Sequence, residues 1–114
     1  MNKEGLLQRI EEISAPDLGG FGEKGGGGAS VRKLEGQLLF KICAAIDAKK
    51  IIETGTHAGC STNYLLEWAS KINAHVYTYD VQENAGKYID TNKKSFLTQF
   101  KPQHYMCAII IKLW

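Results

Sequence analysis

The apolar positions of the chain repeat at two spacings, one typical of helices and one typical of strands. The helical spacing covers residues 2–13, 31–48 and 62–72, and short strand patterns cover residues 51–54 and 75–80. Strand, helix and strand follow one another within about thirty residues, which predicts a parallel pair joined by a right-handed crossover. The loops after both strands then meet at one edge of the sheet, where such sheets bind ligands.

The first two helical segments carry apolar stripes. Residues 2–13 place an apolar stripe on one face, which predicts packing against a domain or a second subunit, and Pro16 is expected to end this helix. The second helix is predicted to begin at Val31 with Ser30 as its N-cap. Gly36 weakens it, so close approach by another backbone or a ligand is the expected reason for that residue. Its predicted core-facing side chains are Leu34, Leu38, Leu39, Ile42, Cys43 and Ile46.

The pattern is less regular after Asp80. Residues 84–100 are predicted to be helical, with a break near Asp90 and Thr91. In the alternative in which Asp80 is an N-cap, a helix runs from Val81 to Asp90. Residues 101–102 indicate a turn, and residues 106–114 an apolar strand.

A glycine-rich stretch separates the first two helices. Residues 19–28 contain seven glycines, a composition typical of a flexible linker. A lid that orders over a ligand, anchored by Phe21, is the alternative. We therefore divide the chain into residues 1–28, an N-terminal helix and glycine-rich loop, and residues 29–114, the predicted ligand-binding unit.

Composition narrows the possible functions. With 114 residues the chain is one small domain, and its net charge of +2 comes without a dense cluster of Lys and Arg. Nucleic-acid binding is therefore not indicated. Neither a signal peptide nor a membrane span is apparent, and the three cysteines have no metal-like spacing. These features predict a cytoplasmic protein without a metal site.

The loop after the first strand carries the candidate chemistry. Gly55 and Gly59 allow a sharp turn and close approach to a ligand over the start of the next helix. A dinucleotide fingerprint would need glycine where His57 and Cys60 stand, and no Walker loop occurs. Glu53, two residues before the first glycine, suits an ammonium or sulfonium and would repel a phosphate.

The run Glu53-Thr-Gly-Thr-His-Ala-Gly-Cys-Ser61 resembles motif I of the class I S-adenosylmethionine-dependent methyltransferases, in the form found in catechol-type small-molecule O-methyltransferases. Residues 29–37 resemble the segment that contacts the methionine end of the cofactor in those enzymes. Residues 76–80 resemble their second strand, whose terminal acid holds the ribose hydroxyls. The resemblance covers roughly residues 29–89.

The resemblance implies an α/β fold, a Rossmann-like parallel sheet with flanking helices, here truncated after about the third strand. It implies S-adenosyl-L-methionine as cofactor, a small-molecule methyl acceptor, and a homo-oligomer or a complementing C-terminal chain. Glu53 would anchor the methionine ammonium, and Asp80 would hold the ribose. The cofactor-binding residues implied in this way are Ser30, Val31, Glu53, Gly55, Thr56, His57, Ala58, Gly59, Ser61, Asp80, Val81 and Gln82.

Several residues keep alternative interpretations. Asp80 also suits the N-cap of the predicted helix that follows it. His57 is the best of three histidines as a general base, although packing against the cofactor is the simpler interpretation. Cys60 most simply packs. His75 and His104 are expected to be structural or exposed to solvent.

Two functional classes stay open on these residues. The first is a methyltransferase, active when complete or complemented by another chain. The second is a non-catalytic cofactor-binding or assembly module built on the same half-fold. A dinucleotide-dependent enzyme is a third and weaker alternative, because the loop lacks the required glycines.

Overall fold

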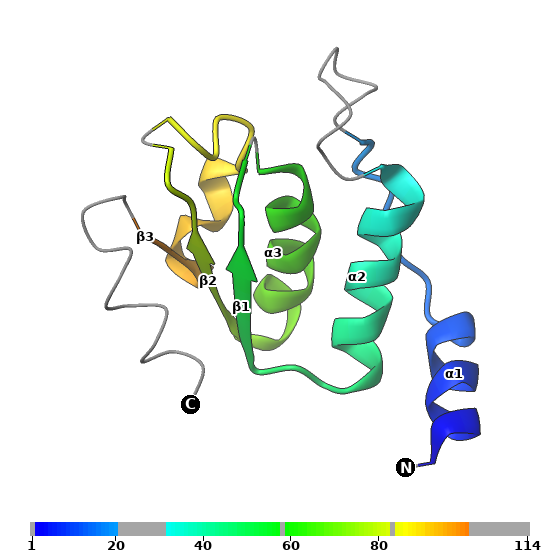
Figure 1. Ribbon diagram of the computed structural model, residues 1–114. Helices are drawn as coiled ribbons and strands as arrows, with labels where there is room; N and C mark the ends of the chain where they lie inside the picture. The colour runs from blue at the N-terminus through cyan, green and yellow to red at the C-terminus, as the bar shows by residue number, and fades with distance from the viewer. Residues whose placement is uncertain (1, 21–31, 58, 83, 101–114) are drawn as a thin grey trace.

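The computed structural model describes residues 2–20, 32–57, 59–82 and 84–100. The described elements are α1 (Lys3–Glu12), α2 (Lys33–Ala45), β1 (Lys50–Thr54), α3 (Cys60–Ile72), β2 (His75–Tyr79), the 3-10 helix η2 (Thr91–Phe96) and β3 (Leu97–Phe100). The three strands form one parallel sheet in the order β1-β2-β3 (Figure 1). The predicted α/β, Rossmann-like architecture is confirmed.

The sheet presents different side chains on its two faces. Val76 and Thr78 of β2 are fully buried, and Val76 joins the core that β2 forms with α3. Ile51 and Glu53 of β1 are paired in register with these two residues, so they lie on the same face. Tyr77 and Tyr79 alternate with these residues along β2 and lie on the opposite face.

Helix α1 ends before the residue predicted to stop it. Asn2 Oδ1 accepts a hydrogen bond from the backbone N–H of Gly5 at 2.8 Å and caps the start of the helix. The last helical residue is Glu12, so the helix ends well before Pro16. No residue of α1 is buried, so the rest of the described structure covers its apolar side chains only in part.

Helix α2 differs from its prediction in both its start and its buried face. The N-cap is Arg32, whose backbone N–H and Nε both donate to Glu35 Oε1 at 3.0 and 3.1 Å, so Ser30 is not the N-cap. Only Cys43 of the six predicted core residues is buried, and Leu39 packs against the core. Leu34, Leu38, Ile42 and Ile46 are exposed, while Gly36, Phe40 and Ala45 are buried instead.

Gly36 is explained by a neighbouring side chain, rather than by a backbone or a ligand. A Cβ added at this position would overlap the aromatic ring of Tyr64 on α3. The absence of a side chain therefore lets α2 pack closely on α3. The Tyr64 hydroxyl donates to the carbonyl of Gly19 at 2.8 Å and accepts from the N–H of Leu18 at 3.1 Å, so the same ring holds the chain before the glycine-rich stretch.

Of the helical region predicted after Asp80, only residues 91–96 are helical, as the 3-10 helix η2. Residues 84–88 form turns, η2 follows, and residues 97–100 form β3 rather than the end of a helix. Gly86, with φ of +87°, breaks the segment where a long helix was expected. The turn at residues 101–102, the strand at residues 106–114 and the lid anchor Phe21 lie outside the described residues.

Candidate functional site

A cluster of hydroxyl groups surrounds the carboxylate of Glu53 near the carboxyl end of β1. Ser61 Oγ donates to Glu53 Oε2 at 2.5 Å, and Thr62 Oγ1 donates to Oε1 at 2.5 Å. Thr78 Oγ1 of β2 also donates to Oε1, at 2.8 Å. Thr56 Oγ1 lies 2.6 Å from Thr78 Oγ1 and supplies the proton of that contact, because the Thr78 proton is directed to Glu53.

The charge of Glu53 is not balanced by a cation among the described residues. Its three hydrogen-bond donors are all neutral hydroxyls, and none of the described ion pairs includes it. Burial raises the pKa of Glu53; the hydroxyl donors oppose this shift, and the nearby Asp80 carboxylate adds to it. A carboxylate can accept about four hydrogen bonds, so Glu53 retains capacity for a cationic donor.

The two glycines of the loop after β1 serve different purposes. Gly55 has φ of +83°, and apart from its chain neighbours no described residue has an atom within 4 Å of the position a Cβ would take, so the space beside it is open on that side. Gly59 has φ of +96° and caps α3, but a Cβ there would lie 2.5 Å from Ile89 Cγ1. The expected close approach of a ligand is therefore compatible with Gly55, whereas Ile89 fills the space at Gly59.

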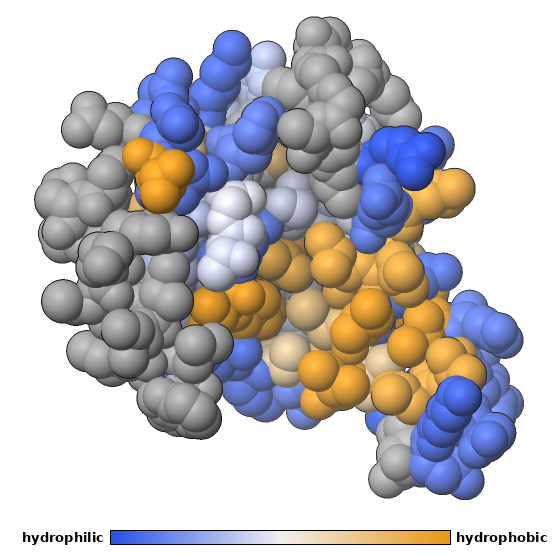
Figure 2. Space-filling model, in the orientation of Figure 1, coloured by the Kyte–Doolittle hydropathy of each residue, from blue (hydrophilic) through white to orange (hydrophobic). Residues whose placement is uncertain are grey.

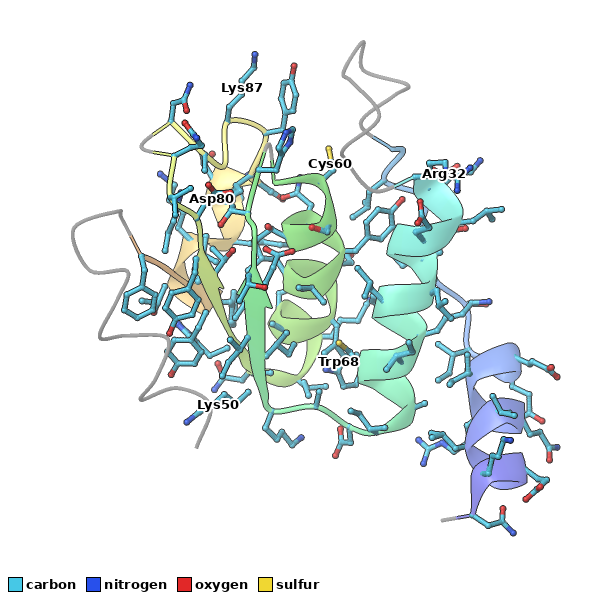
Figure 3. All side chains as sticks on the ribbon, viewed as in Figure 1. Arg32, Lys50, Cys60, Trp68, Asp80 and Lys87 are labelled. Carbon is cyan, nitrogen blue, oxygen red and sulfur yellow. The ribbon has the colours of Figure 1, made fainter. Side chains whose placement is uncertain are left out.

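Asp80 connects the loops that follow β1 and β2. Its Oδ2 accepts from the backbone N–H of His57, and its Oδ1 accepts from that of Gln82, both at 2.8 Å. Figure 3 shows Asp80 and Cys60 at the same end of the sheet, where β2 ends and α3 begins. The alternative that Asp80 caps a helix is wrong, because the described residues after it are not helical.

Backbone contacts fix His57 between two loops. Besides donating to Asp80, its main chain accepts from the N–H of Gly86 at 2.5 Å. The residue is exposed and has φ of +49°, in the left-handed region. Its role as a general base stays a prediction.

The structure brings Glu53, Thr56, Ser61 and Asp80 together at one end of the sheet, as predicted. Val81 and Gln82 follow Asp80 and are exposed, while Ser30, Val31 and Ala58 lie outside the described residues. Thr62 and Thr78, which also donate to Glu53, were not among the predicted site residues. The register of the parallel pair could have indicated Thr78, which is paired with Glu53 and points toward α3.

The structure shows the surroundings of two residues whose interpretation was open, Cys60 and His75. Cys60 is buried at the start of α3, in agreement with packing. His75 is half-buried, and its Nε2 lies 2.7 Å from Thr98 Oγ1 of β3. His104 lies outside the described residues.

No protein-family model matches the chain, and no curated protein resembles it significantly.

None of the helices in the described ranges is sufficiently long and apolar to span a bilayer. Within the same residues, no three His, Cys, Asp or Glu side chains gather as a metal site would require.

Proposed function

We propose that this chain binds S-adenosyl-L-methionine as the cofactor-binding part of a methyltransferase that transfers a methyl group to a small molecule. The observation that carries the proposal is the carboxylate of Glu53, which is held by three neutral hydroxyls and lacks a cation among the described residues. Such a group favours a ligand with a positive charge. The cofactor has both an ammonium and a sulfonium.

The residues at this end of the sheet fit the proposed cofactor. Glu53 would accept from the methionine ammonium, and the open space beside Gly55 leaves room for the ligand. Asp80 lies at the end of the neighbouring strand, and each oxygen uses one backbone donor. Each oxygen therefore retains capacity for a ribose hydroxyl.

The proposed chemistry requires little from the protein beyond binding and orientation. When bound, the cofactor supplies an electrophilic methyl group on a sulfonium. The residues of this chain would orient that cofactor and balance its charge, which lowers the barrier for attack by an acceptor oxygen or nitrogen.

The proposal is tested by calorimetric titration of the full chain with S-adenosylhomocysteine and, separately, with adenosine. We expect Glu53→Gln to weaken binding of S-adenosylhomocysteine by about 10- to 100-fold, the effect of losing a hydrogen bond to a charged group. Adenosine has no ammonium, so the same variant should bind it as the unmodified chain does. Asp80→Asn should weaken binding of both ligands.

Glu11→Gln is the matched control, because Glu11 is an exposed carboxylate on α1, remote in sequence from both loops. Circular dichroism establishes that each variant is folded. A folded, unmodified chain that binds neither ligand would contradict the proposal and favour a non-catalytic assembly module. Equal weakening of both ligands by Glu53→Gln would contradict the role given to Glu53.

A further inference from the structure

The two oxygens of the Glu53 carboxylate have different surroundings. Oε1 accepts from Thr62 Oγ1 at 2.5 Å and from Thr78 Oγ1 at 2.8 Å. Oε2 accepts from Ser61 Oγ at 2.5 Å and from no other described residue. A carboxylate offers about two acceptor positions on each oxygen, so two donors use the capacity of Oε1. A further donor is therefore accommodated at Oε2.

The oxygen with two donors is the one on the interior side of the site. The side chains of Thr62 and Thr78 are fully buried. Ser61 is only half-buried, and Gly55 has open space on one side. Figure 2 shows mainly hydrophilic side chains at the top of the view, where the loops after β1 and β2 lie, and a hydrophobic area over α2 and α1. A polar ligand that arrives from solvent at this end therefore meets Oε2 rather than Oε1.

Two different elements hold the interior pair of hydroxyls. Thr78 is the residue of β2 that pairs with Glu53 in the parallel register, so the two side chains are neighbours on one face of the sheet. Thr62 lies in the first turn of α3, shortly after the loop that leaves β1. The strand register and the start of the helix therefore fix Oε1 from two directions, which opposes rotation of the carboxylate.

A third threonine fixes the direction of the Thr78 hydroxyl. Thr56 Oγ1 lies 2.6 Å from Thr78 Oγ1, and Thr56 is also buried. A threonine hydroxyl has one proton, so Thr78 donates to Glu53 and accepts from Thr56. This chain of hydroxyls ends on a group that accepts, and it therefore favours the ionised form of the carboxylate.

We propose that Thr62 and Thr78 are positioning residues for the cofactor: their hydroxyls hold Oε1 of Glu53, which directs Oε2 toward the ammonium. The inference rests on the proposed function, and it gives a role to two threonines that the resemblance to methyltransferases does not include. A carboxylate that is already oriented loses less freedom on binding than one that the ligand must order. The hydroxyls therefore increase the affinity for the ammonium without contacting it.

The test compares Thr78→Val and Thr62→Val, which keep the shape of the side chain and remove its hydroxyl, with Thr78→Ser and Thr62→Ser, which keep the hydroxyl. In the free, full chain, NMR follows the ionisation of Glu53 through the signal of its carboxyl carbon, identified by its loss in Glu53→Gln. Hydrogen bonds to a carboxylate favour its charged form, so both valine variants should raise the pKa of Glu53 further. Both serine variants should leave it close to that of the unmodified chain.

Other titratable side chains at this end of the sheet do not affect the comparison. They lie at the end of β2, in the loop after β1, at the start of α3 and in the turns after β2, and they are Asp80, His57, Cys60, Lys87 and Tyr88. All of them are the same in the valine and serine variants. Their titration therefore cancels in the difference between the members of each pair.

Calorimetric titration measures the effect on the ligand. At neutral pH each valine variant should bind S-adenosylhomocysteine about 3- to 10-fold more weakly, the effect of one hydrogen bond, and each serine variant should bind it nearly as the unmodified chain does. Adenosine has no ammonium, so all four variants should bind it equally well. Circular dichroism establishes that each variant is folded.

Thr98→Val is the matched control. Thr98 Oγ1 also has a side-chain partner, His75 Nε2 at 2.7 Å, but this contact lies at the start of β2, far along the strand from Asp80. The control should change neither the pKa of Glu53 nor the affinity for either ligand.

Three results would overturn the inference. The first is a pKa of Glu53 that is the same in the valine and serine variants. The second is an unchanged affinity of the valine variants for S-adenosylhomocysteine while Glu53→Gln weakens it, in which case the proposed function stands and the threonines are structural. The third is a folded, unmodified chain that binds neither ligand, in which case the proposed function fails and the positioning role fails with it.

Discussion

At the scale of single residues, Gly55 and Gly59 share a positive φ but differ in their surroundings. Gly55→Ala introduces only backbone strain, which we expect to lower the free energy of unfolding by about 1–2 kcal/mol. Gly59→Ala adds an overlap with Ile89, so its loss should be larger by roughly 1–3 kcal/mol. Urea denaturation followed by circular dichroism measures both values.

Gly5→Ala serves as the reference for replacing a helical glycine, because Gly5 lies within α1 and its φ is not positive. It should stabilise the protein slightly, through the higher helix propensity of alanine. Equal losses for Gly55→Ala and Gly59→Ala would contradict the assignment of Ile89 as the neighbour that requires glycine.

The sequence could predict the acids of the site better than their partners. Glu53 and Asp80 stand at the ends of predicted parallel strands, and that topology alone brings them to one edge. Thr62 and Thr78 were missed because short hydroxyl residues occur throughout helices and strands. Their contact with Glu53 depends on strand register and on where α3 begins, which a hydrophobic pattern does not specify.

At the scale of elements, Lys93 attaches η2 to α3. Its Nζ lies 2.6 Å from Glu67 Oε2 and 3.2 Å from Asp90 Oδ2, and its side chain is 25% exposed. Lys93→Ala leaves two carboxylates without their shared cation, so we expect a loss of about 1–2 kcal/mol, between the values for exposed and buried pairs. Thermal denaturation in low and high salt measures the effect.

Lys94→Ala is the matched control, because Lys94 is the next residue, is exposed and has no ion pair among the described residues. It should change the melting temperature little. If both lysine variants are equally stable, the partly buried ion pair does not hold η2 on α3.

Element positions were predictable where periodicity and caps agree. Helix α3 and strand β2 follow their patterns closely, and Asn73 ends α3 in the left-handed conformation as its side chain permits. Helix α2 was predicted with the wrong face inward, since both of its faces are apolar. The burial of Phe40, rather than of Leu38, is decided by packing on α3, where Phe40 and Trp68 meet edge to face at 6.2 Å.

At the scale of the whole molecule, stability should depend on pH through two carboxyl groups of opposite behaviour. Burial raises the pKa of Glu53, so the folded state holds the proton of this carboxyl more tightly than the unfolded state does. The resulting contribution to the free energy of unfolding is fully present below the ordinary pKa and is lost as the pH rises through the raised pKa. Hydrogen bonds from Asn92 and Lys93 lower the pKa of Asp90, so its contribution is present above the ordinary pKa and is lost as the pH falls through the lowered value.

Glu53→Gln should therefore become more stable relative to the unmodified chain as the pH increases from about 4 to about 8. Asp90→Asn should weaken the fall in the free energy of unfolding that occurs as the pH decreases below the ordinary pKa of an aspartate. Chemical denaturation across this range provides both curves. A Glu53→Gln profile parallel to that of the unmodified chain would show that the carboxylate is not destabilised by its surroundings.

The overall architecture was the most predictable feature. When a strand, a helix and a strand follow one another closely, the helix almost always forms a right-handed crossover between two parallel strands. The parallel pair of β1 and β2 therefore follows from the local pattern. The third strand was not predictable at its observed position, because β3 has only four residues and follows a helical pattern. Its pairing with β2 depends on contacts distant in sequence.

The Tyr64 hydroxyl has a consequence for how the chain assembles. Its bonds with Leu18 and Gly19 close a loop of about 45 residues, whereas the bond from Trp68 Nε1 to the Ala48 carbonyl, at 2.9 Å, closes one of about 20. Because the entropy lost on loop closure grows with loop length, the longer closure is the less favourable early step. We therefore expect the chain around Leu18 to dock after α2 and α3 have met, and to be the first part released on unfolding.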